Sequence, residues 1–127
     1  MKTSKKKRMN QPESPARQHT RGGKSHYRFE DSWYEEEFTN AIISDTRISI
    51  DILTEEDGEK DTVIVTAVST DNGHTYSGSY KYQRDRTNVG QVEFIRYRGR
   101  SGDIFKGQWV AADGSRDLWF IEVDPPE

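Results

Sequence analysis

Apolar and polar residues alternate along much of the chain from residue 48 onward. Ile48, Ile50 and Ile52 recur at every second position, which places them on one face of an extended strand. The next segment, 62–70, is β-branched almost throughout, which is typical of a strand buried on both faces or of a barrel wall. The period of two therefore predicts β-structure in this part of the chain.

Four later segments continue the strand pattern. They span residues 74–84, 90–98, 103–112 and 116–124. In the first of them, Tyr76, Gly78, Tyr80 and Tyr82 share one face. The last is apolar on both faces for most of its length, and the two prolines that follow it end the pairing because proline has no N–H to donate.

Short turns separate these six strands. Asp57-Gly58 is typical of a type I′ hairpin turn, which needs positive φ at both central residues. The strands follow one another at intervals of about 10 to 16 residues, too short for the helical crossovers of a parallel sheet. We therefore expect an all-β fold, an antiparallel meander of six or more strands that forms a small barrel or a curved sheet.

A meander also predicts which turns lie together. The turns at 55–61, 85–89 and 113–115 should share one end of the sheet, and those at 71–73 and 99–102 the other.

The segment 32–43 has two interpretations. Ser32-x-x-Glu35 resembles a helix capping box, and Tyr34, Phe38, Ala41 and Ile42 recur at helical spacing, which predicts a short N-terminal helix. The competing interpretation is a first strand over 37–43, because Ile42-Ile43 favours sheet.

Charge is distributed unevenly along the 127 residues, although the formal net charge is only −3. Residues 1–28 carry nine Lys/Arg and one acid, whereas 29–127 carry ten Lys/Arg and twenty-one acids. The first segment is rich in polar residues and has no apolar periodicity, so it buries too little surface to offset its ordering entropy. We predict a disordered basic tail over 1–28 and one β-domain over 29–127.

The composition excludes several classes of protein. There is no cysteine, which excludes disulfides, cysteine-ligated zinc and a thiol nucleophile. No run of about 18 apolar residues could span a membrane, and no apolar signal segment follows the basic run at 5–8. We expect a cytoplasmic protein.

Glycine followed two residues later by an aromatic residue recurs in Gly78-Ser79-Tyr80 and Gly107-Gln108-Trp109, with Trp119 on the last predicted strand. Over about residues 74–123 this pattern resembles calycin-like barrels such as avidins and lipocalins, although the lipocalin Gly-x-Trp near the first strand is missing. The resemblance implies a closed or half-closed barrel with a small-molecule pocket at one mouth. The alternative interpretation is that the aromatic side chains fill the core and the glycines relieve crowding at strand bends.

Motifs for catalysis, metals and cofactors are absent from the sequence. The three histidines, His19, His26 and His74, have no metal-ligand spacing, and no nucleophile elbow or phosphate-binding glycine loop occurs. We predict no catalytic residues, no metal site and no cofactor.

Two basic clusters suggest contact with nucleic acid or another anion. Lys5, Lys6, Lys7 and Arg8 form a polycation that would release counterions from a phosphate backbone. Arg96, Arg98 and Arg100 surround Tyr97, a combination that can follow a single strand by charge and stacking.

These observations lead to a ranked set of hypotheses. The first is a non-enzymatic binding or interaction module for a small molecule or a protein, with Tyr80, Tyr82, Trp109 and Trp119 as candidate pocket residues. The alternatives are a nucleic-acid-associated protein that binds through its basic tail, and a small barrel enzyme with a pocket acid or tyrosine. A homodimer is a further expectation, because an open edge of six strands could pair with a second copy.

Overall fold

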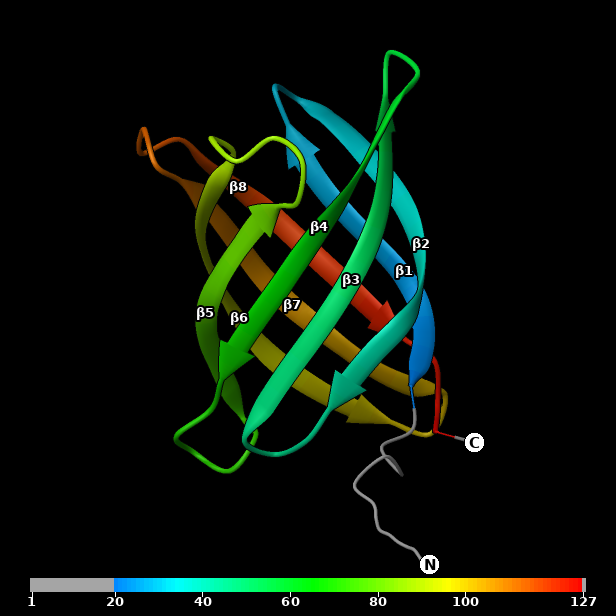
Figure 1. Cartoon of the computed structure of the whole chain (residues 1–127). Helices are drawn as coiled ribbons and strands as arrows, with labels where there is room; N and C mark the ends of the chain where they lie inside the picture. Colours follow the sequence, from blue (N-terminus) through cyan, green and yellow to red (C-terminus); the bar gives the residue numbers. More distant parts are fainter. Residues whose placement is uncertain (1–19, 127) are drawn as a thin grey trace, which may run out of the picture.

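Eight antiparallel strands close into a barrel in the computed structural model, which describes residues 20–126 (Figure 1). The strands are β1 (Arg21–Phe29), β2 (Ser32–Ile43), β3 (Arg47–Glu56), β4 (Glu59–Val68), β5 (Thr75–Tyr82), β6 (Val89–Gly99), β7 (Gly102–Ala111) and β8 (Arg116–Val123). Each strand pairs with the next, and β1 pairs with β8 to close the sheet. The predicted all-β meander is confirmed, with eight strands instead of the six recognised in the sequence.

The inward positions are those that the period of two predicts. Ile48, Ile50 and Ile52 are buried on β3, whereas Leu53, which follows Ile52 on the opposite face, is 70% exposed. The same alternation runs round the barrel and gives a core of seventeen buried residues: Phe38, Ala41, Ile48, Ile50, Ile52, Val63, Val65, Ala67, Tyr76, Tyr80, Val92, Phe94, Phe105, Trp109, Trp119, Ile121 and Val123. An eight-stranded barrel is just wide enough for such side chains to fill it or to leave room for one small ligand.

The turns gather at two ends, as the meander predicts. Asp57 and Gly58 have φ of 53° and 81°, which confirms the predicted hairpin geometry. This β3–β4 hairpin shares one end of the barrel with the β1–β2, β5–β6 and β7–β8 turns (Figure 1). We call it the upper end. The β2–β3, β4–β5 and β6–β7 turns lie at the lower end, beside the start of β1 and the end of β8.

The predicted helix over 32–43 is wrong, because this segment is strand β2. The pairing of β2 with β1 contains a bulge: Phe38 pairs with Gly23 and Ala41 with Arg21, so two residues of β2 lie opposite Gly22 alone. The bulge brings Phe38 and Ala41, three positions apart, onto the same inward face, where both are buried. A bulged strand therefore imitates helical spacing. The competing strand interpretation had the right element type but started too late, at residue 37.

The predicted basic tail is too long, because residues 21–28 belong to β1. Ser25 is fully buried and its Oγ accepts a hydrogen bond of 2.8 Å from Trp119 Nε1. The sequence concealed this strand because its hairpin turn, Glu30-Asp31, has positive φ at both residues but contains no glycine to mark it. Residues 1–19 lie outside the described part of the chain.

Closure of the sheet removes the argument for a dimer built by edge pairing. Every strand of residues 20–126 has a neighbour on both sides, and β1 pairs with β8, so neither the first nor the last of these strands is left as an edge strand. Within the same residues, no helix has the length and apolarity needed to cross a membrane.

A cluster of charged side chains occupies the lower end of the barrel. We call Arg21, Asp45, Arg96, Arg98 and Asp103 the charged cluster. Arg96 donates hydrogen bonds of 2.7 and 3.0 Å to Asp103 Oδ2 and one of 3.0 Å to the hydroxyl of Tyr76. The side chains of Arg96 and Asp103 are each only 9% exposed. Burial alone would lower the pKa of Arg96, but the hydrogen bonds to Asp103 and Tyr76 outweigh it and raise this pKa.

We predict that Asp103→Asn destabilises the barrel by about 3 kcal/mol, because Arg96 loses its buried counter-ion and keeps only the exposed Asp45. The matched control is Asp45→Asn. Asp45 also pairs with Arg96, at 3.3 Å, but its side chain is 50% exposed, so this change should cost less than about 1 kcal/mol. Urea unfolding followed by tryptophan fluorescence measures both. Equal losses for the two variants would contradict the proposed role of the buried pair.

Candidate functional site

A cavity of about 360 Å³ opens at the upper end of the barrel. Its walls come from every strand except β6 and from the β5–β6 and β7–β8 turns at that end. It is lined by seven aromatic side chains (Tyr27, Phe29, Tyr34, Tyr80, Tyr82, Trp109, Trp119), four acids (Glu36, Glu55, Glu56, Asp113) and six other residues (Ile52, Thr54, Val63, Asn88, Ala111, Ser115). We call it the aromatic cavity. Its volume lies in the range of pockets that hold small molecules.

The structure brings all four predicted pocket residues to this cavity. Tyr80 and Tyr82 come from β5, Trp109 from β7 and Trp119 from β8. Trp119 also packs against Phe94 of the core, with ring centroids 6.0 Å apart, so it stands between the cavity and the core. Trp109 donates its Nε1 hydrogen to the carbonyl of Arg28, at 3.0 Å.

The glycines of the repeated motif have the role that the alternative interpretation gave them. A Cβ atom at Gly107 would lie 1.7 Å from the carbonyl oxygen of Glu93, on the neighbouring strand. Gly107 therefore permits a close approach of β6 and β7. The aromatic residues of the two motifs, by contrast, face the cavity as well as the core.

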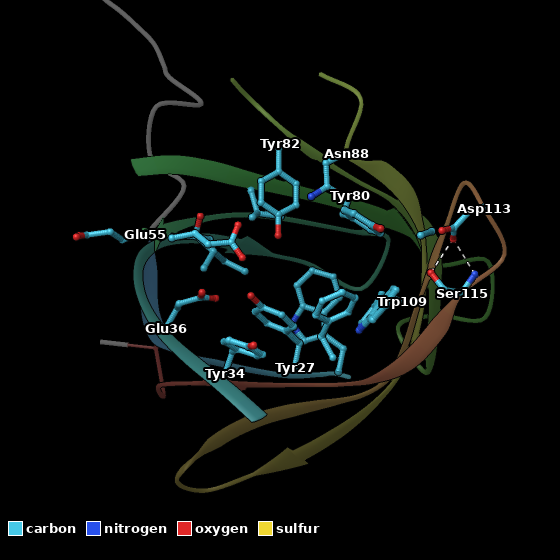
Figure 2. A pocket seen from close by; sticks show the side chains of 17 residues that line it. Tyr27, Tyr34, Glu36, Glu55, Tyr80, Tyr82, Asn88, Trp109, Asp113 and Ser115 are labelled. Carbon is cyan, nitrogen blue, oxygen red and sulfur yellow. Dashed lines mark hydrogen bonds between the residues drawn. The ribbon is translucent and has the colours of Figure 1, made fainter. Parts of the chain in front are cut away.

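Tyrosine rings form much of the wall. Tyr27 and Tyr34 stack with centroids 5.1 Å apart and planes inclined by 13°. Tyr80 meets both Tyr82 and Trp119 edge to face, at 6.4 and 5.9 Å. Figure 2 shows the hydroxyl groups of Tyr27 and Tyr82 directed into the space between the walls.

Glu36 is the half-buried acid of the cavity, and its carboxylate points toward the same space (Figure 2). Burial, with the nearby charge of Glu56, raises the pKa of Glu36 to about 7. Neither the hydrogen bonds nor the ion pairs among residues 20–126 include this carboxylate. Near neutral pH, Glu36 therefore exists in both protonation states and has its oxygens free for a ligand.

Three cavity tyrosines, Tyr27, Tyr80 and Tyr82, stay protonated at neutral pH. Burial, with the charge of Glu36, raises the pKa of Tyr82 to about 12 and that of Tyr27 further still. Burial also raises the pKa of Tyr80, which is only 5% exposed. None of the hydrogen bonds in the described part of the chain uses the Tyr80 hydroxyl, and a buried polar group of this kind normally has a partner.

Four of the seventeen lining residues, all of them aromatic, were predicted from the sequence. Tyr27 was assigned to the tail, and Glu36 lies in the run Glu35-Glu36-Glu37, where nothing distinguishes the middle acid until the phase of β2 is known. Tyr34 and Glu36 do stand at the period of two that predicts one shared face. That spacing was the available signal, but the helical interpretation obscured it.

The second set of candidate residues, the basic ones, does not form a site in the described residues. Lys5, Lys6, Lys7 and Arg8 lie outside them. Arg96 is buried in the charged cluster at the lower end, and Arg98 donates a hydrogen bond of 2.9 Å to Asp45. Arg100 lies in the exposed β6–β7 turn.

The described residues also contain no cluster of metal-binding side chains. No three His, Cys, Asp or Glu side chains within residues 20–126 lie close enough together to hold a metal ion.

Comparison with known proteins identifies the fold and no family. No family model matches the chain, and no curated protein matches it. Among solved structures, a redesigned β-barrel is similar with a TM-score of 0.60 and 14% identity, over 85% of this chain and 91% of that one. The likeness supports a small closed barrel, the architecture common to calycin-like proteins.

We predict that Glu36→Gln raises the Tm by a few degrees at pH 8 and leaves it nearly unchanged at pH 4.5. The pKa of Glu36 is higher in the folded protein, at about 7, than its ordinary value of 4.5. The folded protein therefore loses stability as the pH rises from 4.5 to about 7, because the unfolded chain ionises Glu36 more readily than the folded one. Glutamine mimics the protonated acid and avoids the loss.

The control for this measurement is Glu37→Gln, the same change at an exposed position of the same strand. Thermal unfolding by circular dichroism at both pH values compares the two variants. If the Tm difference between Glu36→Gln and the wild type is the same at pH 8 and at pH 4.5, the raised pKa is contradicted.

Proposed function

We propose that this protein is a non-enzymatic binding module that holds a small, largely apolar molecule in the aromatic cavity. The observation that carries the proposal is the cavity itself: about 360 Å³ of space walled by seven aromatic side chains at one end of a barrel whose other end is filled. Aromatic side chains that serve only as core would pack this space, since protein interiors contain few voids larger than a water molecule.

The polar groups of the cavity support the same conclusion. Ligand pockets are predominantly apolar and carry a few polar groups that orient the ligand. Here Tyr80 supplies a buried hydroxyl and Glu36 a half-buried carboxyl, and no hydrogen bond among residues 20–126 uses either group. A bound molecule would provide the partners that these groups lack.

A fluorescence titration tests the proposal. The chain has three tryptophans, of which Trp109 and Trp119 line the cavity and Trp33 lies outside it, 51% exposed. In a Trp33→Phe background, N-phenyl-1-naphthylamine, a neutral aromatic probe, should quench the remaining emission with a saturable dependence on concentration. The quenching arises because the probe sits within contact distance of both indoles.

Two variants show whether the probe enters the cavity. Ala111→Phe fills space in the wall and should weaken binding by about tenfold or more, whereas Ala112→Phe, the next residue and exposed, should leave it unchanged. Emission that is altered neither by this probe nor by smaller aromatic probes of either charge, or binding that survives Ala111→Phe at full strength, would refute the binding function.

A second candidate function, a small barrel enzyme, is favoured by Glu36. A carboxyl group whose pKa is about 7 suits a general base or acid at neutral pH, and the protonated Tyr27 and Tyr82 can donate hydrogen bonds to a substrate oxygen. Hydrogen exchange at the carbon beside a carbonyl tests for such a base.

In this test, 4-phenyl-2-butanone is incubated with the protein in deuterium oxide and deuterium uptake is followed by mass spectrometry. Uptake that Glu36→Gln abolishes and Glu37→Gln preserves would favour the enzyme. Uptake no faster than in buffer would favour the binding module.

A further inference from the structure

We propose that the ligand of the aromatic cavity is an organic cation, an amine or ammonium group on an apolar body, with the Glu36 carboxylate as its counter-ion. This inference rests on the proposed binding function and adds the charge of the ligand to it. It follows from the juxtaposition of an acid with stacked tyrosine rings in a cavity to which residues 20–126 contribute no basic side chain.

The charges of the lining have one sign. All four ionisable side chains in the wall other than tyrosine are acids, and no Lys, Arg or His of the described residues is among them. The basic side chains inside the barrel, Arg21 and Arg96, belong to the charged cluster at the lower end, on the far side of the core. An anionic ligand such as a carboxylate would therefore meet repulsion here without a compensating cation.

Glu36 is the best placed of the four acids. Asp113 already accepts hydrogen bonds from the backbone and hydroxyl of Ser115, at 2.9 and 2.6 Å (Figure 2). Glu55 and Glu56 are exposed at the end of β3, where water screens their charges. Glu36 lies deeper in the cavity and is half-buried, so an interaction with its carboxylate is screened less.

The aromatic walls suit the same ligand. A cation is attracted to the face of an aromatic ring, and cages of such rings recognise ammonium groups in water. Tyr27, Tyr34 and Tyr82 line the cavity together with Glu36. The ring faces can hold the alkyl or methyl groups around the charge, while the carboxylate balances it.

Binding of a cation should depend on the protonation of Glu36. The groups that face it are Tyr27 of β1, Tyr34 of β2, Glu55 and Glu56 of β3 and Tyr82 of β5, and none of them carries a positive charge. Because its pKa is raised to about 7, Glu36 is largely neutral at pH 5.5 and largely ionised at pH 8. A cation would lower this pKa and release a proton to solvent, so affinity should rise with pH over this range.

Three probes of similar shape and different charge test the inference at pH 8: 2-phenylethylamine, which is protonated, 2-phenylethanol, which is neutral, and 3-phenylpropanoate, which is anionic. We expect the amine to bind at least about tenfold more tightly than the alcohol, and the carboxylate most weakly. Isothermal titration calorimetry measures each affinity on the full chain. At pH 5.5 the affinity for the amine should be weaker than at pH 8, and the other two probes should show no such loss.

The variants Glu36→Gln and Glu37→Gln separate the cavity acid from an exposed acid on the opposite face of β2. Glu36→Gln should reduce the affinity for the amine by about tenfold and remove its pH dependence, while leaving the alcohol unaffected. Glu37→Gln should change neither. Rescue of the amine affinity by Glu36→Asp would add support, since it restores a carboxylate.

The failures of the two proposals are distinguishable. If N-phenyl-1-naphthylamine binds but the alcohol or the carboxylate binds as tightly as the amine, the inference about charge is wrong and the binding function stands. Equal amine affinity in Glu36→Gln and Glu37→Gln would also overturn it. If neither the neutral dye nor any of the three probes binds, both proposals fail.

Discussion

The pairing of β1 with β8 is the constraint on which the rest of this structure depends. Five residue pairs, from Gly23 with Val123 to Tyr27 with Trp119, join the first strand to the last and turn an open meander into a ring. Closure gives every strand two neighbours and creates an interior with a defined width. It also brings Tyr27 beside Trp119, with ring centroids 6.2 Å apart, so the wall of the aromatic cavity is completed by the same contact.

The interior divides into three zones with different physical roles. At the lower end, Arg96 and Asp103 are buried as a hydrogen-bonded ion pair, an arrangement in which each charge requires the other. Above it, Tyr76, Phe94 and Phe105 pack edge to face and fill the cross-section. At the upper end the rings pack against one another along the walls and enclose space. One barrel therefore contains a closed base, a packed middle and a cavity.

The two ends of the barrel also differ in whether their charged side chains are neutralised by a partner. At the lower end the buried arginines are neutralised by aspartates, whereas at the upper end no basic side chain of the described residues lies in the cavity wall beside the acids. Burial of Glu36 beside Glu56 disfavours its ionised form, as the raised pKa records. A positively charged ligand would relieve this penalty, so the proposed selectivity for cations rests on the same feature that destabilises the unliganded barrel.

The sequence by itself determined the type and direction of most strands. Period-two spacing in 48–53 and 74–84 and the hairpin signal Asp57-Gly58 are local properties, because they depend on backbone conformation within a few residues. The same local logic identified four of the cavity's aromatic residues. It failed where local and tertiary requirements conflict: the bulge between Phe38 and Ala41 imitated a helix, and the basic composition of 21–28 concealed a strand. Only the tertiary structure decided that β1 closes the barrel, that Glu36 and not its two neighbours faces inward, and that Arg96 is buried. Each of these depends on which distant strand lies alongside, and the spacing of residues within one segment does not determine which strand that is.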